Sequence, residues 1–158
     1  MSMYMRKSGM KRLLHLSILL MVATQAHLVA ASFHERVVAS VIVLEAGGEG
    51  PEGMRAVAEV IRNRAINRKA DAFSVVTRPR AFSVTNGGIS RMLRKAEIHP
   101  RYQEAARLAK MIHLRFSGLG STVGGADHFK TVGTPAYWAK GHKPVRVIGR
   151  MEFYRLRK

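Results

Sequence analysis

The chain has 158 residues, with 27 Lys and Arg against 10 Asp and Glu, which gives a formal net charge of +17. This length allows one domain with little room for a second, and an apolar fraction of 47% excludes disorder throughout. A sequence without cysteine has no disulfide, thiolate zinc site, iron–sulfur cluster or cysteine nucleophile. The charge indicates a polyanionic partner: nucleic acid, anionic lipid or an acidic cell-wall polymer.

The N-terminus has the pattern of a secretory signal peptide. Residues 6–12 carry four basic side chains and no acid, residues 13–23 form an apolar run, and small residues follow up to Ala31. We therefore predict a signal peptide over residues 1–31 and an exported domain over 32–158. The alternative is an uncleaved membrane anchor, because the apolar stretch is nearly long enough to span a bilayer.

The domain that remains is itself basic. Removing the signal peptide takes away four positive charges and leaves 23 basic against 10 acidic residues, a net charge of +13. An exported protein does not normally meet chromosomal DNA, so an anionic wall polymer or membrane surface is favoured over nucleic acid. We expect a monomer in the periplasm or cell wall.

The exported part is predicted to begin with helices. Residues 32–47 have a broad apolar face that ends at two glycines, and residues 51–68 repeat apolar side chains along one helical face. Residues 69–90 contain one proline and an Asn-Gly-Gly run, which favours loops and short turns. A third long helix is expected over residues 100–116.

The composition changes towards the C-terminus. Residues 119–158 contain six glycines and several β-branched residues, and residues 145–154 alternate partly in the manner of a terminal strand. Helices first and strands last is the pattern of an α+β fold.

Glu45 is the carboxylate whose surroundings favour a catalytic role. It follows the apolar run 41–44 and lies at the C-terminal end of its predicted helix. The negative end of the helix dipole and the apolar neighbours both disfavour the charged form, which should raise the pKa of Glu45. A general acid near neutral pH needs such a raised pKa. On position alone, an ordinary exposed glutamate on the last helical turn is the alternative.

The neighbouring acids have simpler interpretations. Glu49 follows a Gly-Gly break and is either a loop carboxylate or a second active-site acid. Glu52 complements the positive end of the second helix. Glu59 lies four residues after Arg55, where we expect a solvated ion pair.

Motifs of other chemistries are missing from the sequence. It has no Gly-x-Ser-x-Gly, no Walker-type loop and no His-x-x-x-His pair. His128 beside Asp127 is a candidate ligand or base, but we predict no metal and no cofactor. Tyr137 and Trp138 are adjacent aromatics, so one ring can stack on a sugar while the other enters the core.

Residues 44–64 read Leu-Glu-Ala-Gly-Gly-Glu-Gly-Pro-Glu-Gly-Met-Arg-Ala-Val-Ala-Glu-Val-Ile-Arg-Asn-Arg. This stretch resembles the signature of the cell wall hydrolases related to the spore-cortex-lytic enzyme SleB, in which Glu-Ala-Arg-Gly-Glu precedes an Ala-Val-Ala, Val-Ile, Asn-Arg helix. The resemblance extends over nearly all of residues 35–155. Shorter blocks agree in the same order, at residues 81–83, 124–129, 135–139, 148–149 and 153–154.

The resemblance implies a lysozyme- and lytic-transglycosylase-like α+β domain, with N-terminal helices and a small C-terminal β-rich part, that acts on peptidoglycan. The family's catalytic acid is the first glutamate of its motif, which corresponds to Glu45. Gly47 stands where the family has Arg, Ala81 where it has Gln, and Met151 where it often has His. These departures concern substrate contacts more than the acid.

The implied reaction is cleavage of the β-1,4 bond between N-acetylmuramic acid and N-acetylglucosamine. Glu45 would act as general acid and then as base in a lytic transglycosylase, whereas true hydrolysis would use Glu49 as a second carboxylate. The non-catalytic alternative is a basic module that binds the wall or a membrane surface, and a nucleic-acid-binding protein is a third. The candidate substrate-binding residues are Phe82, Ser83, His128, Tyr137 and Trp138.

Overall fold

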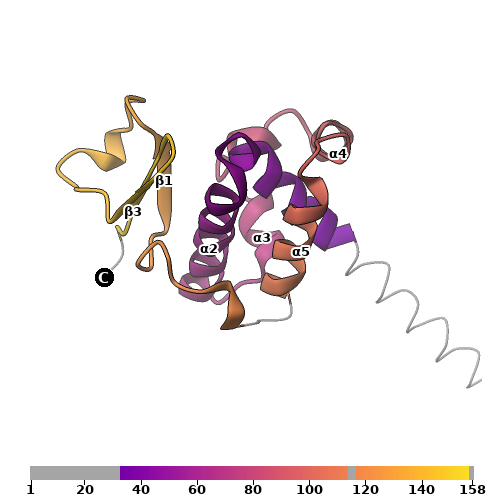
Figure 1. Cartoon of the computed structure of the whole chain (residues 1–158), viewed down its shortest axis with the longest axis horizontal. Coiled ribbons are helices and arrows are strands. Elements are labelled where there is room, and N and C mark those ends of the chain that lie inside the picture. Colours follow the sequence, from indigo (N-terminus) through magenta and orange to yellow (C-terminus); the bar gives the residue numbers. More distant parts are fainter. Residues whose placement is uncertain (1–32, 114–116, 157–158) are drawn as a thin grey trace, which may run out of the picture. The chain divides into compact units, whose positions relative to one another are not determined.

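The computed structural model describes residues 33–113 and 117–156 (Figure 1). The predicted signal peptide, and the anchor that is its alternative, lie outside these residues. The chain divides into two units, residues 1–34 and 35–158, and the site described below lies entirely in the second. Within the described ranges, no helix is both long and apolar enough to cross a membrane.

The first two predicted helices are confirmed. Residues 33–46 are helical, and the 3-10 helix η1 (Gly47–Glu49) leads directly into α2 (Gly50–Arg68). The two glycines thus form a tight helical turn rather than an open loop. Pro51 lies in the first turn of α2, where its missing N–H removes no helical hydrogen bond.

The segment 69–90, which was expected to hold loops and short turns, contains a short α-helix as well. Helix α3 (Ala72–Thr77) begins after Asp71, whose side chain accepts a hydrogen bond from the Ser74 N–H at 2.8 Å. This is an N-cap, which Asp favours. The 3-10 helix η2 (Ser83–Thr85) follows.

Two further helices complete the helical part. Helix α4 (Ile89–Glu97), for which the sequence pattern gave no prediction, buries Met92 and Ala96 and keeps basic side chains in its last turn. The third predicted helix is confirmed as α5 (Tyr102–His113). Residues 114–116 of its predicted range lie outside the described residues.

The C-terminal part is a three-stranded antiparallel sheet in the order β1-β3-β2, with strands β1 (His128–Thr131), β2 (Arg146–Ile148) and β3 (Met151–Tyr154). The prediction of one terminal strand over 145–154 is wrong, because the chain reverses at Gly149 and pairs Ile148 with Met151. The φ angle of Gly149 is 53°, which glycine adopts without strain. The overall prediction of an α+β fold is confirmed.

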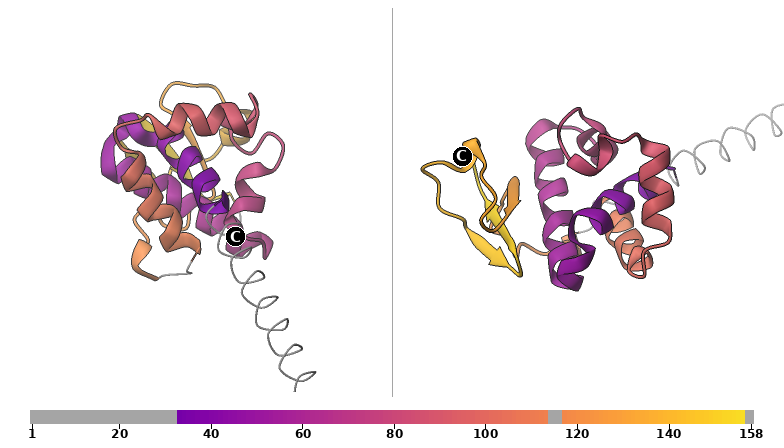
Figure 2. Two further views of the ribbon diagram at one scale, coloured as in Figure 1. Left: turned by 90° about the vertical axis from the view of Figure 1, so that its right-hand side faces the viewer. Right: turned by 90° about the horizontal axis from the view of Figure 1, so that it is seen from above.

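Helix α2 lies between the sheet and the other helices (Figures 1 and 2). Its predicted apolar face, which includes Met54, Val57 and Ile61, is fully buried. Glu59 on the opposite side is also fully buried, so the predicted solvated ion pair with Arg55 is wrong. The helix has two buried faces because the sheet and its preceding segment cover the second one.

Polar side chains spaced four residues apart on α2 bind the segment 119–127. The bonds run from Arg55 Nη1 to Leu119 O at 3.1 Å, from Val123 N–H to Glu59 Oε2 at 3.1 Å, and from Asn63 Nδ2 to Ala126 O at 2.8 Å. Such spacing puts the three side chains on one helical face, and their partners follow in the same order. The segment therefore runs alongside α2 and brings the start of β1 to the end of the row.

Candidate active site

Glu45 lies near the C-terminal end of the helix over residues 33–46, as predicted, and its side chain is half-buried. The Ser83 hydroxyl donates a hydrogen bond to its Oε1 at 3.4 Å, and the main-chain N–H groups of Val84 and Ser83 also bond to it. Burial raises the pKa of Glu45 and outweighs these hydrogen bonds and the charge of Arg64, which lower it. This pKa direction suits a carboxyl group that gives up a proton near neutral pH.

Phe82 fixes the turn that contacts Glu45. Its ring is 3% exposed, lies 6.1 Å from the Phe129 ring between centroids, and has the guanidinium carbon of Arg64 at 4.9 Å from its centroid. Phe82, which the sequence placed among the substrate-binding residues, is thus part of the core. It anchors η2, so that the next residue, Ser83, reaches the carboxylate.

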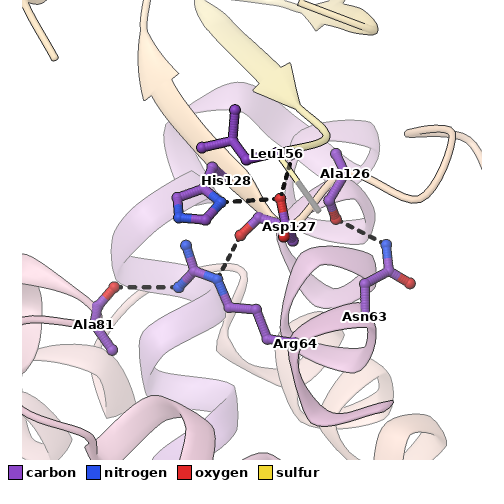
Figure 3. A network of polar contacts seen from close by, with 7 residues as sticks. All are labelled: Asn63, Arg64, Ala81, Ala126, Asp127, His128 and Leu156. Atoms are coloured by element: carbon purple, nitrogen blue, oxygen red, sulfur yellow. Dashed lines mark hydrogen bonds and ion pairs between the residues drawn. The ribbon is translucent and has the colours of Figure 1, made fainter. Parts of the chain in front are cut away.

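Arg64 forms the centre of a polar network that joins α2 to the segments preceding η2 and β1 (Figure 3). Its Nε donates to Asp127 O at 2.6 Å and its Nη1 donates to Ala81 O at 3.3 Å. Burial and, second, the neighbouring Arg68 lower the pKa of Arg64 to about 10, while Asp127 and Glu45 raise it. Arg64 therefore keeps its positive charge at neutral pH.

Asp127 orients His128 (Figure 3). The Asp127 side chain is buried, and its Oδ1 lies 2.9 Å from His128 Nδ1 and accepts from the Leu156 N–H at 3.0 Å. Burial alone would raise the pKa of Asp127, but the hydrogen bonds from His128 and Leu156 together lower it. An ionised Asp127 holds a proton on Nδ1 of His128 and leaves Nε2 as the acceptor of the neutral ring.

The predicted aromatic pair has one packed ring and one exposed ring. Trp138 lies 5.1 Å from the His128 ring and meets Tyr154 edge-on at 5.4 Å, between ring centroids. Tyr137 is 93% exposed. Trp138 is half-buried and packs on His128 and Tyr154 rather than entering the core, and sugar stacking stays a prediction. Among the predicted site residues, Glu45 is therefore in direct contact with Ser83, and His128 is in direct contact with Trp138.

Glu49 holds the turn between β2 and β3. Its Oε2 accepts from the Arg150 main-chain N–H at 2.9 Å, and its Oε1 accepts from Arg150 Nε at 3.1 Å and Nη2 at 3.0 Å. The main-chain bond and, in addition, the guanidinium lower the pKa of Glu49. A Cβ atom at Gly149 would collide with Glu49 Oε2, so glycine permits this close approach.

The three residues that depart from the family motif, Gly47, Ala81 and Met151, each have identifiable contacts or packing in the structure. A Cβ atom at Gly47 would lie 2.7 Å from His99 Cε1, so the His99 ring occupies the space next to Gly47. Ala81 contributes its carbonyl to Arg64. Met151 is 4% exposed and packs in the core from β3.

Arg64 is the site residue that the sequence pattern did not single out. The signal that points to it is the polar row on α2, since Asn63 continues the spacing set by Arg55 and Glu59, and Arg64 follows directly. A polar row opposite an apolar face usually indicates that this side of the helix is solvated. In this protein the polar row instead lies on a second buried face of α2.

These features define an α+β domain in which burial favours the protonated form of one central carboxylic acid. The chain belongs to the cell wall hydrolase family, which matches residues 48–154. This membership supports peptidoglycan hydrolase activity and an extracellular or wall-associated location. The match begins after Glu45, so the role of that residue rests on the geometry.

The structure comparison agrees with this family. The catalytic domain of the SleB protein of Bacillus cereus is similar, with a TM-score of 0.59 and 23% identity, over 78% of this chain and 91% of that chain. At this identity the similarity shows the fold alone. A comparison with curated proteins gives no match.

Proposed function

We propose that the protein cleaves the β-1,4 bond between N-acetylmuramic acid and N-acetylglucosamine as a lytic transglycosylase, with Glu45 as general acid and base. The observation that carries this proposal is the half-buried Glu45 carboxyl, whose pKa burial raises and which Ser83 contacts. The family membership supports peptidoglycan as the polymer.

In the proposed reaction, protonated Glu45 gives its proton to the glycosidic oxygen as the bond from that oxygen to the muramyl C1 breaks. The sugar passes through an oxocarbenium-like transition state. The muramyl 6-hydroxyl then forms a bond to C1, and the Glu45 carboxylate takes its proton. The product is a 1,6-anhydro sugar, no water is consumed, and Glu45 returns to its protonated form.

The contacts of Glu49 favour a structural role over that of a second acid. Its carboxylate is already engaged by three donors of Arg150, whereas a hydrolytic base needs a free oxygen facing water. Transglycosylation needs only one carboxylate, so this route fits the contacts better. Hydrolysis with Glu49 as the second carboxylate is the competing route.

We assign substrate contact to the exposed or half-buried members of the predicted set. These members are Ser83, His128, Tyr137 and Trp138. Phe82 is buried and so acts indirectly, by holding η2 in place. The exposed Tyr137 ring is suited to stack on a sugar face.

The segment 132–147, which contains the long connection between β1 and β2 and the first two residues of β2, is our candidate for contact with anionic wall polymers or a membrane surface. From His128 to Met151 the sequence has no acid. Lys140, Lys143 and Arg146 are exposed and form no ion pair with any described residue. The free positive charge of this segment would attract a polyanion.

We further propose that the protein is exported with residues 1–31 as a cleaved signal peptide, the uncleaved anchor being the alternative. It would act as a monomer in the periplasm or cell wall, with no nucleic-acid partner. An N-terminus near Ser32 in the exported protein would support cleavage.

Mass spectrometry of digested peptidoglycan tests the proposed reaction. Products with 1,6-anhydromuramic ends are expected, and reducing muramyl ends would instead indicate hydrolysis. The alternative of a non-catalytic wall-binding module predicts that no fragments are released.

A further inference from the structure

We infer that Arg64 is a positioning residue for the acid, because its buried guanidinium ties the turn that contacts Glu45 to the strand that carries His128, and supplies a positive charge that acts on Glu45. This inference rests on the proposed role of Glu45 as the general acid.

One guanidinium group joins two segments that are far apart in the sequence. Nη1 donates to the carbonyl of Ala81, which directly precedes the Phe82–Ser83 turn, and Nε donates to the carbonyl of Asp127, which directly precedes His128. The Phe82 ring lies against the same guanidinium. A shift of Arg64 would therefore move Ser83 and His128 together.

The surroundings of Arg64 increase the strength of these interactions. The residue is 9% exposed, so water screens its charge and its hydrogen bonds poorly. Its pKa of about 10 leaves it charged throughout the range in which a carboxylic acid titrates. The planar guanidinium can direct donors at two carbonyls at once, which the single nitrogen of a lysine does less well.

Arg64 supplies the charge among the groups that act on Glu45. The others are the Ser83 hydroxyl and the main-chain N–H groups of Val84 and Ser83, all from η2 and all neutral. A nearby positive charge favours the ionised carboxylate. Arg64 thus opposes the effect of burial and limits how far the pKa of Glu45 rises.

Two substitutions separate the effect of the positive charge of Arg64 from the effect of its hydrogen-bond geometry. Arg64→Gln removes the charge, whereas Arg64→Lys keeps the charge but loses the planar donor pair. Arg107→Gln, at an exposed position of α5, is the matched control because it lowers the net charge equally. Each variant is tested as the full domain, with its thermal midpoint and its peptidoglycan-cleaving rate measured across pH.

Activity needs protonated Glu45 and so falls as the pH rises through the pKa of that residue. Without the charge of Arg64 this pKa is higher, so we expect Arg64→Gln to move the alkaline fall in activity to higher pH. Arg64→Lys should leave the fall in place and lower kcat by about tenfold or more, since small misplacements of reacting groups are costly. Arg107→Gln should change neither.

A folded, active Arg64→Gln whose alkaline fall stays in place or moves to lower pH would overturn the role of the charge. If Arg64→Gln does not fold, Arg64→Lys decides: an unchanged kcat or a displaced pH profile overturns the inference, and a lower kcat with the same profile supports it. Full activity of Glu45→Gln would instead overturn the proposed function, so the two failures are distinguishable.

Discussion

The hydroxyl of Ser83 donates a hydrogen bond to Oε1 of Glu45, although the two residues are 38 positions apart in the chain. The contact joins the end of the first helix to η2, which the buried Phe82 holds in place. Burial favours the protonated form of Glu45, and the donors around it favour the ionised form. The proton affinity of this carboxyl thus depends on residues contributed by distant parts of the sequence.

Replacing Ser83 by alanine should shift the pH dependence of activity. Loss of a donor to the ionised carboxylate raises the pKa of Glu45, so the alkaline fall in activity should move to higher pH. The rate at the optimum should fall by no more than about tenfold, because a hydrogen bond contributes about 1 kcal/mol. A pH–rate profile checks this, with Ser83→Thr, which keeps the hydroxyl, as the control; a shift to lower pH would contradict the assignment.

Replacing Glu49 by glutamine should affect stability more than catalysis. The bonds with Arg150 lower the pKa of Glu49, so its stabilising effect is present above the pKa of the unfolded chain and lost as the pH falls through the lower folded value. The thermal midpoint of Glu49→Gln should therefore be lower than that of the wild type at neutral pH, and the difference should vanish in acid.

The same variant distinguishes the two roles considered for Glu49. As a structural residue it leaves the rate within about threefold, whereas a second catalytic carboxylate would contribute about a hundredfold or more. Glu52→Gln, at an exposed position in the first turn of α2, is the control for the charge change. A hundredfold loss in Glu49→Gln with a normal thermal midpoint would point to hydrolysis.

The two adjacent aromatics should respond differently to truncation. Tyr137→Ala removes an exposed ring and should raise KM for glycan by about fivefold, corresponding to about 1 kcal/mol of lost apolar contact, with no change in thermal midpoint. Trp138→Ala removes the ring packed between His128 and Tyr154 and should lower the midpoint as well. Equal effects on stability would mean that this packing does not persist in solution.

The basic segment 132–147, between β1 and the start of β2, should govern binding to anionic wall material. A triple Lys140→Ser, Lys143→Ser, Arg146→Ser variant should bind purified walls more weakly at low salt, and the difference should shrink as added salt screens the charges. The control is Arg91→Ser, Arg94→Ser, Lys95→Ser, which removes three exposed cations from α4. Equal losses in the two variants would indicate that only net charge matters.

Local patterns were enough to predict the first helix, α2, α5 and the position of Glu45, but not α3 or α4. Apolar periodicity predicted the first helix and α2. The position of Glu45 at the end of the first helix, next to apolar residues, predicted that its pKa is raised. Burial proved to be the largest cause of the raised pKa, and it depends on η2, which no local pattern brings to the helix end.

The parts that sequence reasoning missed depend on contacts between distant segments. Glu59 was assigned to a surface ion pair because Arg55 was the partner that helical spacing indicated. In the structure its carboxylate oxygens accept hydrogen bonds from the Thr122 hydroxyl and the Val123 N–H. The turn between β2 and β3 was missed because partial alternation continues across Gly149. That glycine was the available signal, since a glycine within a strand pattern often marks a reversal or a close approach.

Removal of the Glu45 acid is the most direct test of the proposed mechanism. Purified peptidoglycan would be digested with the wild type and with Glu45→Gln, and the muropeptides separated and weighed by mass spectrometry. We predict 1,6-anhydro products from the wild type, and a loss of at least about a hundredfold in their rate of formation with a folded Glu45→Gln that still binds the wall. Undiminished release of muropeptides by Glu45→Gln would contradict the account.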